Sequence, residues 1–151
     1  MGSPSQRPLV DLVKLQASRL DAIFGAGTYR IESSNDVVCT VRTSAVEAEF
    51  GYDWRDRWVS SSLTALQVPD EISIPHSAEL WLRFKGIDAP VPRTSGLDEQ
   101  QVIDALELVA QAVRTVFSDP ATVRDAAFFA WGYNIAYNDW ASRRGSWTEI
   151  E

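Results

Sequence analysis

The sequence predicts an α+β fold in which an N-terminal helix precedes an antiparallel sheet of four to five strands, and two C-terminal helices pack on the sheet. Residues 37–52 alternate apolar and polar side chains, which is typical of strands with one buried and one solvated face. Residues 9–24 and 98–142 instead repeat their apolar side chains every three or four positions, the period of amphipathic helices. Because the apolar face of the sheet needs a cover, the helices at the two ends of the chain are expected to supply it.

The length and composition are those of one globular unit. The 151 residues fit a single domain, and the 45% of hydrophobic residues argue against wholesale disorder. We expect a flexible tail over residues 1–8, a single α+β domain over 9–145 and a C-terminal tail over 146–151. No stretch resembles a signal peptide or approaches the roughly 20 apolar residues of a membrane helix, so we expect a cytoplasmic protein.

The first half of the chain contains one expected helix and then the strands. The helix spans Leu9–Phe24 and ends at the glycines that follow it. Polar turns are expected at residues 32–36 and 53–56. The expected strands are Thr28–Ile31, Val37–Thr43, Ala45–Tyr52, Arg57–Leu66 and Leu80–Lys85.

The second half of the chain contains two expected helices after a loop at residues 86–96. Asp98 and the glutamine three residues later match a capping box at the start of the first helix. The apolar residues expected to face the sheet from this helix are Val102, Leu106, Val109 and Val113. Asp119 and Pro120 form a typical helix start, and the last helix is expected to end near Ser142, before Gly145.

The composition excludes several kinds of functional site. One cysteine and one histidine leave no disulfide and no cysteine- or histidine-based metal cluster, so we expect neither a metal nor a cofactor. The net charge of −7 argues against nonspecific nucleic-acid binding. Nucleotide-binding loops and serine-hydrolase motifs are absent, so no catalytic residue is predicted, although an unfamiliar enzyme stays open.

The lone cysteine and the lone histidine are both expected to be structural. Cys39 lies among valines in a strand and is expected to be a small buried hydrophobe. His76 follows a proline and is expected at the surface. A nucleophilic Cys39 would need His76 as its base, since the chain has no other histidine.

Acidic residues and two tryptophans gather around the third expected strand and the turn that follows it. Residues 44–100 contain ten acidic and five basic side chains, which predicts an acidic face opposite a basic partner. Tryptophan and arginine are enriched at binding hot spots. The residues expected to bind a partner are Glu47, Glu49, Asp53, Trp54, Asp56 and Trp58. The alternative is a solvated sheet face with the tryptophans folded onto the core.

Residues 127–140 are aromatic around nearly the whole circumference of the last helix. Such a helix is either buried on several sides or lines a pocket. The first interpretation makes it a central packing helix, with Gly132 allowing a close approach. The second makes it one wall of a small-molecule site with these polar groups: Tyr133, Asn134, Tyr137 and Asn138.

Together these features favour a noncatalytic, acidic protein-binding domain, monomeric or weakly dimeric, whose partner is a protein with a basic surface rather than nucleic acid or a membrane. In size, acidity, lack of a catalytic signature and order of helix, sheet and helices, the chain is similar to small bacterial immunity proteins. That resemblance implies an immunity-type inhibitor of a basic bacterial toxin. The alternative is a small-molecule-binding protein or unfamiliar enzyme with a pocket between the aromatic last helix and the sheet.

Overall fold

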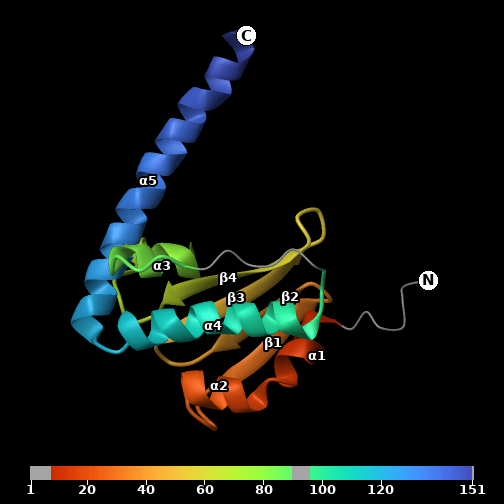
Figure 1. Ribbon diagram of the computed structural model, residues 1–151. Coiled ribbons are helices and arrows are strands. Elements are labelled where there is room, and N and C mark those ends of the chain that lie inside the picture. The colour runs from red at the N-terminus through yellow and green to blue at the C-terminus, as the bar shows by residue number, and fades with distance from the viewer. Residues whose placement is uncertain (1–7, 90–95, 151) are drawn as a thin grey trace.

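The computed structural model describes residues 8–89 and 96–150, with side chains to Arg143, and confirms the α+β fold (Figure 1). All but the last residue of the expected tail over residues 1–8 lies outside the described residues. The helices are α1 (Leu9–Lys14), α2 (Ala17–Phe24), α3 (Ala78–Phe84), α4 (Glu99–Thr115) and α5 (Pro120–Ile150), and η1 (Asp70–Ile72) is a 3-10 helix. The strands are β1 (Arg30–Asn35), β2 (Val38–Arg42), β3 (Val46–Asp53), β4 (Trp58–Ala65) and β5 (His76–Ser77).

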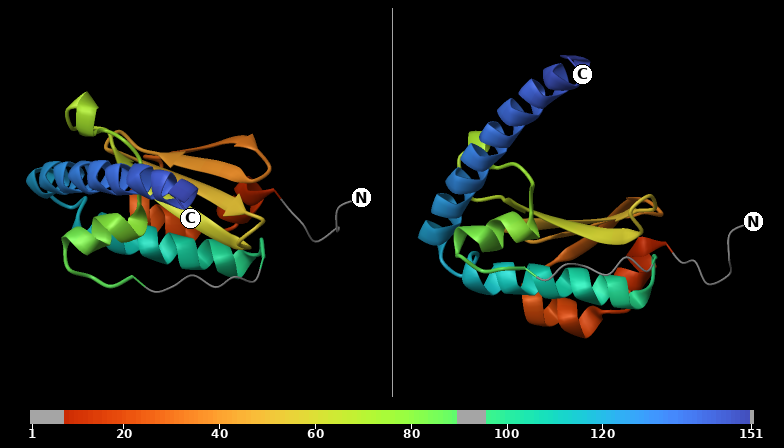
Figure 2. Two further views of the ribbon diagram at one scale, coloured as in Figure 1. Left: turned by 90° about the horizontal axis from the view of Figure 1, so that it is seen from above. Right: turned by 45° about the horizontal axis from the view of Figure 1, so that its top comes forward.

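The five strands form an antiparallel sheet in chain order, β1-β2-β3-β4-β5. Val41, Ala48 and Leu63 face one another in neighbouring strands and are all 0% exposed. The predicted alternation is therefore confirmed, with one dry face and one wet face. Figure 2 shows α1, α2 and α4 on one side of the sheet, whereas α5 rises past it on the other side.

The expected N-terminal helix is two helices, because the chain turns at Gln16 (φ −98°, ψ 35°). The turn buries the Gln16 side chain, whose Nε2 donates a 2.8 Å hydrogen bond to Glu99 at the start of α4. The Gln16 Oε1 accepts a second hydrogen bond from Arg19. The break between α1 and α2 thus lets the buried Gln16 amide form two side-chain hydrogen bonds, as buried polar groups generally do.

The fifth strand lies earlier than expected, and Leu80–Lys85 is not a strand. Residues 78–84 form α3, which begins where the Ser77 Oγ accepts a 3.2 Å hydrogen bond from the Leu80 backbone N–H. Trp81 and Leu82 are consecutive and both 0% exposed. A strand would point them to opposite faces, so only a helix lets both reach the single core.

Other strand and helix bounds differ from the expectation. Strand β1 continues through residues 32–35, which were expected as a turn, because these residues pair with β2 across a bulge. The Asp98 cap is confirmed, since its Oδ1 accepts a 2.9 Å hydrogen bond from the Gln101 backbone N–H. Helix α5 begins at Pro120 as expected but continues past Ser142 and Gly145 to Ile150.

The two C-terminal helices join the core in different ways. In α4, Val102, Leu106 and Val109 are at most 1% exposed, and the helix packs against β4. The first turns of α5, with Val123 and Ala127, belong to this core and Trp131 packs against it, so that the helix contacts α3 and η1. The rest of α5 extends away from the sheet (Figure 1).

Candidate functional site

The turn between β3 and β4 presents Trp54, which is 74% exposed. The Asp53 Oδ1 accepts hydrogen bonds from the backbone N–H groups of Arg55 (2.9 Å) and Asp56 (3.4 Å). The Arg57 N–H donates a 2.7 Å bond to the Asp53 carbonyl, and Arg57 has a φ of 58°, a conformation that costs a side-chain-bearing residue about 1–2 kcal/mol. The Trp54 indole thus projects from a turn whose backbone is fixed by hydrogen bonds to Asp53.

The remaining expected partner-binding residues lie on the wet face of the sheet or at its end. Trp58 is half-buried on β4, directly opposite Asp53. Glu49 is exposed, whereas Glu47 is half-buried and forms a 3.4 Å ion pair with Arg42. The structure therefore places four of the six residues on the β3–β4 pair and the other two, Trp54 and Asp56, in the turn at its end, and an ion pair balances the charge of Glu47.

Arg42 is a residue of this surface that sequence reasoning missed. It lies directly opposite Glu47 in the β2–β3 hairpin. The signal was available, because a short turn at residues 43–45 fixes which side chains of a hairpin face each other. The wet face is consequently mixed in charge near this turn, and toward its other end Glu49 is exposed beside a turn in which Asp53 and Asp56 alternate with Arg55 and Arg57.

Helix α5 is not the central packing helix that its aromatic residues suggested. Trp131 is half-buried against the core, whereas six other large side chains from residue 128 onward are 37% to 62% exposed: Phe128, Phe129, Tyr133, Ile135, Tyr137 and Trp140. A Cβ atom added to Gly132 would meet nothing within 4 Å, so this glycine serves no close approach to another part of the chain that the structure describes. Contiguous exposed aromatic surface of this kind marks an interaction site.

A groove of about 320 Å³ lies between α5, α3 and β5. Three of the four expected pocket residues line it, namely Tyr133, Asn134 and Tyr137, whereas Asn138 does not. On the opposite wall, the Arg83 Nη1 donates a 2.8 Å hydrogen bond to the Tyr133 Oη. A second, wider groove of about 720 Å³ lies on the η1 side of α5 and is lined by Phe128 and Trp131.

His76 lies in the wall of the smaller groove and is 5% exposed, so the expected surface position is wrong. Pairing with Leu63 in the sheet draws it inward, where its ring meets Trp81 edge-on at 5.8 Å. Its Nε2 has no hydrogen-bond partner among the described atoms, and burial lowers the pKa of its imidazole.

Cys39 is 0% exposed, as expected, and burial raises the pKa of its thiol to about 11. The thiol therefore stays protonated and unreactive at neutral pH. Strands β3 and β4 separate Cys39 from His76, so the sheet does not bring the thiol and the imidazole together. Ser77, next to His76, uses its hydroxyl to cap α3.

Comparisons with protein-family models, curated proteins and solved structures find no match to this chain. Within residues 8–89 and 96–150, no helix combines the length and apolar character of a membrane span. The same residues bring no three histidine, cysteine or carboxylate side chains together as a metal site. Function is therefore inferred from the exposed surfaces themselves.

Proposed function

We propose that the protein is a noncatalytic, cytoplasmic protein-binding domain that binds a basic partner through its β3–β4 turn and the adjoining wet face of the sheet. The observation that carries this proposal is the 74% exposure of Trp54 on a turn fixed by the Asp53 hydrogen bonds. Interfaces concentrate their energy in a few aromatic anchors, and a rigid anchor loses little entropy on binding.

Charge supports a basic partner. The chain carries a net charge of −7, and residues 44–100, which include the β3–β4 turn, contain ten acidic and five basic side chains, although in the turn itself Asp53 and Asp56 alternate with Arg55 and Arg57. Exposed charges of one sign mainly raise the association rate and select the partner, whereas the buried anchor sets the dissociation rate. The narrower form of the proposal is an immunity-type inhibitor of a basic bacterial toxin.

Site-specific photocrosslinking tests the proposal. A benzophenone amino acid in place of Trp54 is expected to crosslink one protein in the native host, whereas the same group in place of Leu15 is not. Leu15 is a matched control, since it is 53% exposed and lies beside α1, across the sheet from the wet face. Equal crosslinking at both positions would refute the proposal.

The decisive measurement is the affinity of the captured partner, purified without the crosslink, for the wild-type protein and its variants. We expect Trp54→Ala to raise its Kd at least about 30-fold, mainly through faster dissociation. Glu49→Gln should slow association, and more so at low salt, where screening is weaker. A Kd that Trp54→Ala leaves unchanged would show that the turn is not the anchor.

A small-molecule site is the second candidate function, and the groove between α5, α3 and β5 favours it. Its volume of about 320 Å³ falls at the lower end of ligand pockets, and Arg83, Tyr133 and Tyr137 supply polar groups. A ligand found by thermal-shift screening should lose its stabilising effect in Tyr137→Ala. If each stabilising compound raises the Tm of the wild type and of Tyr137→Ala equally, the groove is excluded as the ligand site.

A further inference from the structure

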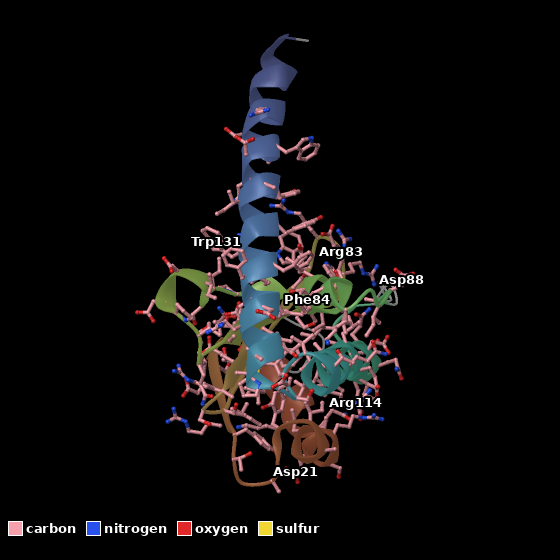
Figure 3. The ribbon with its side chains drawn as sticks, turned by 90° about the vertical axis from the view of Figure 1, so that its left-hand side faces the viewer. Asp21, Arg83, Phe84, Asp88, Arg114 and Trp131 are labelled. Carbon is pink, nitrogen blue, oxygen red and sulfur yellow. The ribbon has the colours of Figure 1, made fainter. Side chains whose placement is uncertain are left out.

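Helix α5 carries a second feature, a stripe of side chains at coiled-coil spacing on its η1 side. The stripe residues follow one another at alternating intervals of four and three: Arg124, Phe128, Trp131, Ile135, Asn138 and Ser142. Phe128 is 62% and Ile135 is 49% exposed, and the rings of Phe128 and Trp131 lie 5.7 Å apart. Figure 3 shows Trp131 on the side of α5 away from Arg83 and Phe84.

We propose that this stripe binds the same stripe of a second copy, with the two α5 helices antiparallel and the two-fold axis between residues 131 and 132. Antiparallel pairing about this axis places Phe128 against Ile135 of the second copy, twice by symmetry. It also places Trp131 over Gly132 of the second copy. Gly132 has open space where a Cβ would stand, so the indole has room to approach the backbone.

The charges at the ends of the stripe complement each other in the same register. Arg124 at one end faces Asp139 of the second copy, and the reciprocal pair forms at the other end. Asp139 already forms an ion pair with Arg143, with 3.2 Å between Oδ2 and Nη2. Its side chain is 62% exposed, so the carboxylate is accessible to a second cation. A parallel arrangement would instead place Arg124 beside Arg124.

The wider groove supplies the seat for the second helix. In the antiparallel register, residues 135–142 of the second copy run alongside residues 121–128. The groove of about 720 Å³ lies there, between η1 and α5, and Pro69 and Ile72 form its apolar wall. On the other side of α5, the place alongside this part of the helix is taken by α3, with Phe84 packed on Phe129.

The distribution of charge favours self-association through α5. Residues 120–150 contain three arginines and three acidic residues, so this segment has no net charge, whereas the whole chain carries −7. Two acidic copies therefore meet through a helix without net charge, and in the groove beside it Arg124 accompanies the acidic Glu71 and Asp125. In Figure 1, the β3–β4 turn lies at the far end of the sheet from α5, so self-association leaves the proposed partner site free.

The area available predicts a weak dimer. A buried aromatic side chain removes roughly 150–250 Å² from water. The exposed parts of Phe128, Ile135 and the half-buried Trp131, with the groove wall, then give on the order of 300–400 Å² per copy, below the roughly 800 Å² of a standard interface. We expect a Kd in the micromolar range.

Sedimentation velocity over a concentration series tests the dimer. Phe128→Glu should raise the dimer Kd at least about 30-fold, because each dimer contains the change twice. Tyr137→Glu is the matched control on the other flank, where Tyr137 is 53% exposed, and it should leave the dimer intact. A wild-type protein that stays monomeric at about 100 µM, or a dimer broken by Tyr137→Glu and not by Phe128→Glu, would overturn the proposal.

Charge reversal tests the register. Arg124→Asp should weaken the dimer because it brings like charges together, and adding Asp139→Arg should restore it. Gly132→Cys, close to the axis, should form an intermolecular disulfide, whereas Ile135→Cys should not, and buried Cys39 does not compete. Failure of the double reversal to restore the dimer, or equal crosslinking at both positions, would exclude the antiparallel register.

Discussion

Replacing Trp81 by phenylalanine tests the hydrogen bonds through which α3 is joined to strands β4 and β5. Trp81 is 0% exposed, and its Nε1–H lies 3.0 Å from the Leu63 carbonyl of β4 and 3.2 Å from the His76 carbonyl of β5. Its ring packs on Phe117, beyond α4, with the ring centroids 4.9 Å apart. Trp81→Phe keeps an aromatic ring in place and removes the shared donor.

The expected loss of stability follows from these contacts. Removing a donor from a buried carbonyl costs about 1–3 kcal/mol, and we expect the lower half of that range because one N–H serves two carbonyls. A cavity of roughly 40 Å³ left by the smaller ring adds about 1 kcal/mol. The free energy of unfolding should therefore fall by about 2–3 kcal/mol, a Tm decrease of roughly 4–12 °C for a chain of this size.

Urea unfolding followed by far-UV circular dichroism measures this loss. Trp54→Phe is the matched control, since the same substitution at a 74% exposed site should change stability by less than about 0.5 kcal/mol. A loss below about 1 kcal/mol for Trp81→Phe would refute the role of the shared hydrogen bond.

Three further predictions concern the buried residues. Leu106 is 1% exposed, so Leu106→Ala should lower the free energy of unfolding by about 2–5 kcal/mol, and an unchanged urea midpoint would contradict its place in the core. His76 has a lowered pKa, so below pH 6.5 the unfolded chain gains the proton before the folded one; the free energy of unfolding should fall with pH from 6.5 downward, and less steeply in His76→Gln. Cys39, with a pKa of about 11, should not react with a thiol reagent at pH 8 until the protein is unfolded, and labelling of the folded protein would show that the strand opens.

Local signals predicted most of the fold. The alternation in β2 and β3 is a property of consecutive residues, and so is the start of α4, where Asp98 accepts a hydrogen bond from within its own first turn. Leu80–Lys85 was ambiguous, because its alternating leucines fit a strand and its neighbouring Trp81 and Leu82 fit a buried helix. The Ser77 cap was the local signal that decides between them.

The candidate site was less predictable, because exposure depends on where distant elements end. Residues 127–140 have the composition of a buried helix. However, α5 extends beyond α3 and the sheet, so most of its aromatic side chains are exposed to solvent. His76 is buried only because β5 pairs with β4 at Leu63. The turn that presents Trp54 contains Arg57 in the left-handed conformation, which no composition rule indicates for an arginine.

The strand order has a consequence for folding during synthesis. Neighbouring strands are consecutive in the chain, so the sheet can form early by closure of short loops. Its cover forms late, because α1 and α2 meet α4 through contacts such as Gln16–Glu99, across 83 residues. At about 5–20 residues per second, α4 emerges from the ribosome roughly 2–8 s after β5. For those seconds the apolar face around Ala48 lacks its main helix, which makes the nascent chain a natural client for chaperones that bind exposed apolar surface.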